Sequence, residues 1–115
     1  MKKIILLSAV LCYSYITAQI KTPQPSPTAT IIQKIGISNV TIDYSRPGVK
    51  KREIFGGLVA YNEMWRTGAN KATKITFEEN FIFGGVKVKK GSYSLFTIPG
   101  KKEWNILLNQ ETELW

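Results

Sequence analysis

The feature that most constrains this chain is an alternation of apolar and polar residues with a period of two. In residues 39–44 one set of alternate positions is apolar or aromatic and the other is polar, and the alternation returns in residues 74–78 and 86–89. Successive side chains of a β-strand point to opposite faces of a sheet. This period therefore predicts strands that bury one face in a core.

Turn-forming residues divide the chain into six or seven short strands. The expected strands cover residues 31–35, 37–45, 72–78, 81–83, 86–89, 92–98 and 104–108. Residues 104–108 are apolar at nearly every position, as in a strand covered on both faces. No segment has a convincing amphipathic helical pattern. We therefore predict an all-β fold, either an antiparallel β-sandwich or a partly open barrel.

Residues 1–18 have the layout of a secretory signal peptide. A lysine pair precedes an apolar run over residues 4–16, and small residues follow it up to Ala18. The run is shorter than the roughly 20 residues that a membrane-spanning helix needs. Leu11, before Cys12, is larger than the residue that lipid-attachment signals carry there. We expect export to the periplasm or cell exterior after cleavage near Ala18, with no transmembrane span in the mature chain.

The remaining residues divide into a leader and one domain. Residues 19–29 hold three prolines at alternate positions, which favour an extended spacer, and residues 30–115 carry the β-pattern. The chain stops at Trp115, directly after a strand expected to need covering. Either the chain is truncated at its C-terminal end or a partner meets an open strand edge.

The residues that are missing exclude several chemistries. The chain has no histidine, and its one cysteine, Cys12, lies in the predicted signal peptide. This removes Ser-His-Asp and Cys-His catalysis and the usual zinc and copper sites. We predict no catalytic residue, metal or cofactor. The enzymatic alternative is a carbohydrate-active hydrolase that uses a carboxylate pair, such as Asp43 and Glu63.

The charge is strongly positive. The sequence has 16 basic and 8 acidic residues, and removing the lysine pair of the signal peptide leaves 14 − 8 = +6. We interpret this as ordinary solubility charge; the alternative is an anionic partner such as an acidic glycan, a lipid headgroup or a cell-envelope polymer. Nucleic acid is not predicted, because no aromatic residues interleave with the basic run at 50–52.

One stretch, residues 44–73, holds all three arginines and Trp65. The candidate ligand-binding residues are Tyr44, Arg46, Trp65, Arg66, Thr67 and Asn70. In a sugar or carboxylate site the indole would stack on a ring and Arg66 would make forked hydrogen bonds. The alternative is a structural corner in which Trp65 fills the core, Arg66 pairs with Asp43 or a free carbonyl, and Asn70 caps a turn.

Several motifs in this stretch and after it resemble a known family. They are YSRP at 44–47, REIFG at 52–56, WRTGAN at 65–70 and GSYSLFTIP at 91–99. Together they resemble the domain-of-unknown-function family 2911 (DUF2911). The resemblance implies an all-β domain exported by Bacteroidetes-type bacteria, with no established activity or catalytic residue. Members of that family continue past the region of Asn109, so the resemblance also implies truncation.

The sequence thus favours a non-catalytic binding or structural module of the cell envelope, with a glycan or other anionic envelope ligand as its partner. The two alternatives are the hydrolase and an assembly module that pairs through an open strand edge. The oligomeric state is left open.

Overall fold

The computed structural model describes residues 19–114, and within them it contains seven β-strands and no helix. This confirms the predicted all-β class. The predicted signal peptide and Trp115 lie outside the described residues. Nothing helical in the described range has the length and apolarity that a membrane crossing requires. The strands are β1 (Thr28–Ile35), β2 (Ser38–Ser45), β3 (Thr73–Phe77), β4 (Phe81–Phe83), β5 (Val86–Val88), β6 (Gly91–Pro99) and β7 (Trp104–Asn109).

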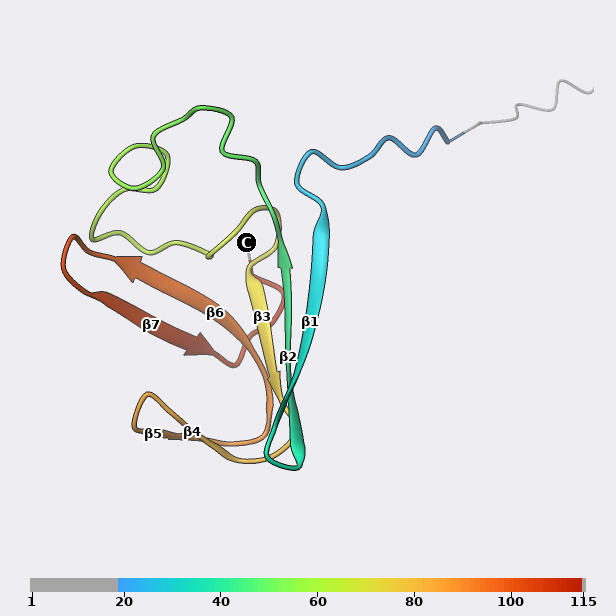
Figure 1. The fold of residues 1–115 in the computed structure, drawn as a ribbon, viewed down its shortest axis with the longest axis vertical. Coiled ribbons are helices and arrows are strands. Elements are labelled where there is room, and N and C mark those ends of the chain that lie inside the picture. Colours follow the sequence, from blue (N-terminus) through green and yellow to red (C-terminus); the bar gives the residue numbers. More distant parts are fainter. Residues whose placement is uncertain (1–18, 115) are drawn as a thin grey trace, which may run out of the picture.

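Five strands form one antiparallel sheet in the order β1-β2-β3-β6-β7, and β4 and β5 form a separate hairpin (Figure 1). The large sheet does not close into a barrel. Its two edges are β1 and β7. The arrangement is sandwich-like, with the hairpin as a small second sheet.

The pairing register of the strands places the alternating apolar residues of the sequence side by side in the sheet. Ile31 pairs with Ile42, Ile42 with Ile75, and Ile75 with Tyr93, so one row of the sheet is apolar across four strands. Directly opposed residues of antiparallel strands lie on the same face. The apolar positions of each strand therefore combine into one face of the sheet.

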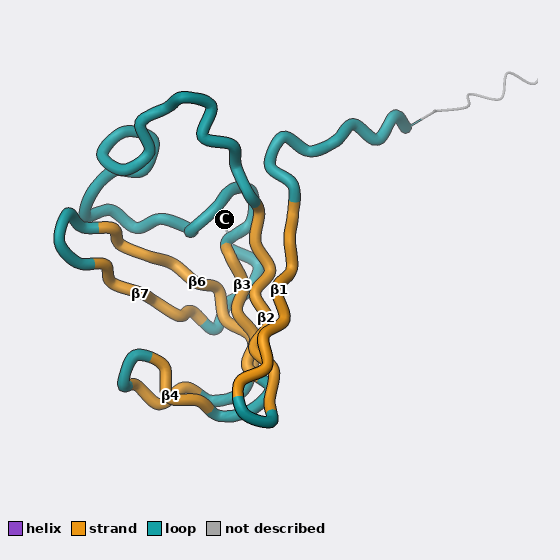
Figure 2. The backbone as a smooth tube through the Cα atoms, in the orientation of Figure 1, coloured by secondary structure: helices purple, strands orange, loops and turns teal. Residues whose placement is uncertain are grey.

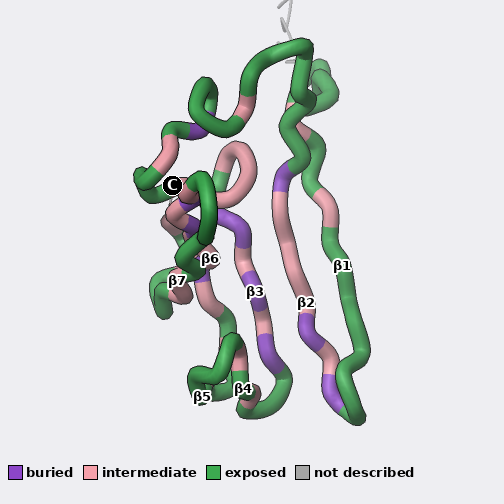
Figure 3. The backbone as a smooth tube through the Cα atoms, turned by 60° about the vertical axis from the view of Figure 1, so that its left-hand side comes forward, coloured by how far each residue is buried: buried purple, intermediate pink, exposed green. Residues whose placement is uncertain are grey.

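The buried core lies on this face over β2 and β3 (Figure 3). Its centre is Phe77, whose ring lies 5.3 Å from that of Phe81, 6.0 Å from that of Phe83 and 6.1 Å from that of Tyr93. The β4–β5 hairpin thus covers the β3 end of the sheet. Burying each large apolar side chain contributes about 1.5–3 kcal/mol, so much of the stability depends on this cluster.

The prediction that residues 104–108 are covered on both faces is wrong. Trp104 is 45% exposed and Ile106 is 54% exposed, and Asn105 on the other face is exposed as well. Only Leu107 and Leu108 are half-buried. An apolar run has the same appearance whether a strand is sandwiched or lies at an open edge, and here β7 is an edge strand.

The 27 residues between β2 and β3, residues 46–72, form an irregular loop (Figure 2). The loop is fixed to β6 at its far end: the Asn62 amide donates to the Pro99 carbonyl at 2.7 Å, and Trp65 forms a bridge with Thr97. The stretch with the candidate site residues is therefore held against the sheet.

Candidate functional site

The position of Trp65 is set by β6. β3 pairs with β6 only as far as Leu95. Beyond Leu95, Trp65 pairs with β6 in place of β3, at Thr97. The Trp65 amide donates to the Thr97 carbonyl at 2.8 Å, and the Thr97 amide donates back at 2.9 Å. Because a bridge of two backbone hydrogen bonds fixes both position and orientation, the indole and the Arg66 side chain leave the sheet at defined points.

The turn after Arg66 is closed by its own side chains. The Thr67 hydroxyl contacts the Trp65 carbonyl at 3.2 Å and the Thr97 hydroxyl at 3.0 Å, and the Thr73 hydroxyl donates to the Thr67 carbonyl at 2.7 Å. Thr67 has φ 59°, in the left-handed region, which costs a β-branched residue about 1–3 kcal/mol. These hydrogen bonds offset that strain.

Asn70 ties the same turn to two other segments. It also has a left-handed backbone, with φ 60°. Its side-chain amide donates to the Ser26 carbonyl at 3.3 Å and to the Ser45 hydroxyl at 3.4 Å. Asn70 therefore joins the turn to the leader and to the end of β2.

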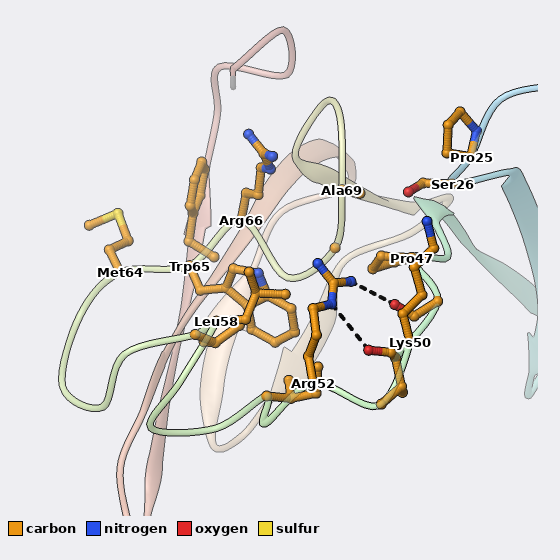
Figure 4. A pocket seen from close by; sticks show the side chains of 16 residues that line it. Pro25, Ser26, Pro47, Lys50, Arg52, Leu58, Met64, Trp65, Arg66 and Ala69 are labelled. Carbon is orange, nitrogen blue, oxygen red and sulfur yellow. Dashed lines mark hydrogen bonds between the residues drawn. The ribbon is translucent and has the colours of Figure 1, made fainter.

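A groove of about 730 Å³ opens beside Trp65. It is bounded by the leader at Pro25 and Ser26, the loop over residues 47–52, and the segments at 58–59 and 64–69 (Figure 4). Its apolar lining is provided by Pro47, Ile54, Leu58, Val59, Met64 and Phe96. A concave apolar surface of this size with few polar groups is typical of a ligand site.

All ionisable groups that line the groove are cationic: Lys50, Arg52 and Arg66. No aspartate or glutamate lines it. Within residues 19–114 the Arg66 guanidinium has no ion pair and no hydrogen bond. Asp43, proposed as its partner in the structural-corner alternative, instead accepts from the Thr30 hydroxyl at 2.6 Å and pairs with Lys74 at 3.5 Å.

Unlike the Arg66 guanidinium, the Arg52 guanidinium is held by hydrogen bonds to backbone carbonyls. Its Nε donates to the Val49 carbonyl at 3.1 Å and its Nη2 donates to the Gly48 carbonyl at 2.7 Å (Figure 4). The loop that supplies these carbonyls turns through Lys50 and Lys51, both with left-handed backbones at φ 49° and 58°. One edge of the Arg52 guanidinium is thus fixed, and its remaining donors are left for a ligand.

Trp65 also belongs to a cluster of three aromatic rings. Phe55, Trp65 and Trp104 lie with ring centroids 5.1–6.4 Å apart in edge-to-face arrangements. Trp104 and Phe55 are 45% and 40% exposed. The cluster therefore extends from the groove to the surface of β7.

Two of the six predicted site residues, the sequence neighbours Trp65 and Arg66, line the groove. Tyr44 lines a separate hollow of about 330 Å³ that it shares with Asp43. Arg46 is exposed and lines neither hollow, and its amide donates to the Pro27 carbonyl at 2.9 Å. The Thr67 hydroxyl is used by Trp65 and Thr97, and the Asn70 side chain joins the turn to the leader and to the end of β2. That these residues bind a ligand stays a prediction.

Sequence reasoning missed three residues that line the groove, Lys50, Arg52 and Phe96, and it did not expect the exposure of the neighbouring Trp104. The basic run at 50–52 is a signal of Lys50 and Arg52, but such a run is equally typical of ordinary solubility charge. Arg52 becomes informative only through its hydrogen bonds to a loop whose conformation the sequence does not specify. Trp104 was assigned to a covered strand.

The carboxylates lie outside the groove. Asp43 lines the second hollow, and Glu63 is exposed and does not line the groove. The pKa of Glu78 is lowered by hydrogen bonds from the Asn39 amide and side chain, and the pKa of Glu113 is lowered by Lys71 at 2.6 Å. The cleft beside Trp65 thus lacks the carboxylate pair that the hydrolase alternative requires.

The comparisons with known proteins give a family and no function. A family model described as "Protein of unknown function (DUF2911)" matches residues 26–115. No curated protein and no solved structure matches the chain. The match covers all seven strands and every residue that lines the groove except Pro25.

Proposed function

The chain belongs to the DUF2911 family of proteins of unknown function, and we propose that it is a non-catalytic binding module of the cell envelope whose ligand is an acidic saccharide. The ligand binds in the groove beside Trp65. Its carboxylate is recognised by Arg66 and Arg52, and its sugar ring lies on the indole.

The observation that carries this proposal is Arg66, which lines a groove whose ionisable groups are all cationic, and whose guanidinium has no ion pair or hydrogen bond within residues 19–114. A planar guanidinium matches a carboxylate through two parallel hydrogen bonds, which are stronger than neutral ones. Arg52 adds a second guanidinium that the backbone already orients, so less entropy is lost when a ligand binds. An anion is therefore the ligand class that this groove favours.

The saccharide part of the proposal rests on the indole and on the predicted site of action. Tryptophan offers a large flat apolar face together with one N–H donor, which suits a ring that is apolar on its faces and polar at its edge. The signal peptide predicted at residues 1–18 would deliver the domain to the envelope, where acidic polysaccharides occur.

Isothermal titration with galacturonate, and with galactose as its uncharged counterpart, tests the proposal. Galacturonate should bind and galactose should bind at least tenfold more weakly, since a charge-assisted hydrogen bond contributes about 1.5–3 kcal/mol. Arg66→Ala should lower the galacturonate affinity by about tenfold or more. Arg46→Ala is the matched control, because Arg46 is exposed and does not line the groove.

Equal binding of galacturonate and galactose, or equal losses in the two arginine variants, would contradict the proposal. Circular dichroism of both variants checks that the fold is intact. Absence of binding to galacturonate and to other uronates would remove the acidic-saccharide assignment.

A second candidate, the assembly module, is favoured by the outer edge of β7. The six residues of β7 include no charge and no proline, and those are the features that usually protect an edge strand from pairing. Light scattering over a range of protein concentrations tests it. Association that Ile106→Lys abolishes would support assembly, and a monomer at every concentration would exclude it.

A further inference from the structure

Trp104 lies next to the groove but is not part of it. We infer that the binding site extends over Trp104 and takes an acidic oligosaccharide, with one sugar unit in the groove and the next stacked on the Trp104 indole. This inference rests on the proposed function, because it names the length of the ligand that the groove takes.

Trp65 connects the two positions. It lines the groove, and its ring centroid lies 6.4 Å from that of Trp104 at an interplanar angle of 73°. Phe55 packs against both indoles, at 6.2 Å from Trp65 and 5.1 Å from Trp104. Neighbouring rings of a saccharide chain are separated by a similar distance. A chain that leaves the groove past Trp65 therefore reaches Trp104 at its next unit.

The Trp104 indole is held in place although it is exposed. In the register of β6 and β7 it lies opposite Pro99, which is fully buried. Phe55 supports it from the loop. A tryptophan that is 45% exposed and yet fixed by packing offers a flat surface with little conformational entropy to lose on binding. Exposed aromatic residues that cluster in this way mark binding surfaces.

The charges beside Trp104 favour an acidic chain over a neutral one. Lys101 and Lys102 precede Trp104 in the turn between β6 and β7, and Glu103 is the one carboxylate among them. With the cations of the groove at the other end, the surface from Arg66 to this turn has an excess of positive charge. A ligand with one carboxylate on each sugar unit matches that distribution.

Titration with mono-, di- and trigalacturonate tests the inference. In the wild-type protein the affinity should rise about tenfold from the monosaccharide to the trisaccharide, the gain expected of one added aromatic contact. Trp104→Leu should bring the ratio of trisaccharide affinity to monosaccharide affinity close to one, and Trp104→Phe should keep most of the tenfold rise. Both variants keep an apolar side chain, so a loss specific to leucine reports the ring. Ile106→Ala, on the same strand, is the control that should keep the wild-type ratio.

Each outcome decides one point. No rise with chain length in the wild-type protein, or an unchanged ratio in Trp104→Leu, would overturn the extended site while monosaccharide binding still supported the groove. Absence of binding to all three galacturonates would overturn the proposed function, and this inference with it. If Ile106→Ala also abolishes the rise in affinity with chain length, the rise depends on the packing of β7 and not on the Trp104 ring. That result would also overturn the inference.

Discussion

Trp65 and Thr97 exchange two backbone hydrogen bonds, of 2.8 Å and 2.9 Å, where β3 has ended and β6 continues. This bridge turns a residue of an irregular loop into an extension of the sheet. It places the Trp65 indole next to Trp104 and starts the turn that carries Arg66. The bridge thus attaches the wall of the groove that carries Trp65 to the sheet, although that wall is a loop.

The buried hydroxyl pair beside this bridge should contribute measurably to stability. Thr97 is 4% exposed and its hydroxyl lies 3.0 Å from that of Thr67. Thr97→Val removes this bond and should lower the free energy of unfolding by about 1 kcal/mol in a urea titration. Ser92→Ala is the control: it removes the exposed hydroxyl pair with Thr76, which water can replace, and should cost less than about 0.5 kcal/mol. Equal losses would contradict the account of this turn.

Gly68 should tolerate no side chain. An added Cβ would lie 3.1 Å from the Ser45 carbonyl oxygen and 3.4 Å from the Thr73 hydroxyl, and the residue has φ +156°. Gly68→Ala should therefore lower the free energy of unfolding by about 1–3 kcal/mol and weaken ligand binding, because Arg66 precedes this turn. At Gly48 the added atom would meet only the Lys50 side chain, at 3.7 Å or more. Gly48→Ala should be close to neutral, and equal denaturation midpoints for the two variants would refute the prediction.

The stability of the domain should depend on Phe77, at the end of β3, more than on the exposed residues of the β4–β5 hairpin. Phe77 is 3% exposed and packs against three aromatic rings, whereas Ile82 is 72% exposed. Phe77→Ala should lower the free energy of unfolding by about 3–5 kcal/mol, and Ile82→Ala should change it by less than about 0.5 kcal/mol. Chemical denaturation measures both. Comparable effects would mean that the core is centred elsewhere.

Glu78 should make stability depend on pH in acid. Hydrogen bonds from Asn39 lower the pKa of Glu78 below its ordinary value of 4.5. A carboxyl group with a lowered folded-state pKa stabilises the fold above its unfolded pKa, and this is lost as the pH falls through the folded pKa. Glu78→Gln should lower the melting temperature at pH 7, and the difference from wild type should shrink below about pH 4.5.

The neighbouring Glu79 provides the control for that measurement. It is exposed, and within residues 19–114 its side chain accepts no hydrogen bond. Glu79→Gln should leave the pH profile of the melting temperature close to that of the wild-type protein. A difference between Glu78→Gln and wild type that stays constant from pH 7 to pH 3 would show that the two Asn39 hydrogen bonds are not linked to protonation.

The fold could be predicted from the sequence because a period of two is a local property. Val40, Ile42 and Ile75 reach the core through strand geometry alone, and no tertiary information is needed to expect it. The environment of β7 could not be predicted this way. Whether Trp104 and Ile106 are covered depends on which strand forms the edge of the sheet. That is decided by the order of the strands, which a local pattern does not contain.

The candidate site was partly predictable for a similar reason. Trp65 and Arg66 stood out as a dense group of functional side chains, but Thr67 and Asn70 stood out equally. Only the three-dimensional structure separates them, because the partners of Asn70 lie 44 and 25 residues away in the sequence. Arg52 enters the site for the same physical reason: its orientation comes from carbonyl groups of a loop with two left-handed residues.

The most direct test of the central claim uses the fact that the chain has only three arginines, Arg46, Arg52 and Arg66. Their Nε–H signals can be followed individually by two-dimensional ¹H–¹⁵N NMR while galacturonate is added, after assignment with the three Arg→Lys variants. We predict that the Arg66 and Arg52 signals shift in a saturable way and that the Arg46 signal does not move. Equal small shifts of all three signals, or a response of Arg46 alone, would contradict a specific anion site in the groove.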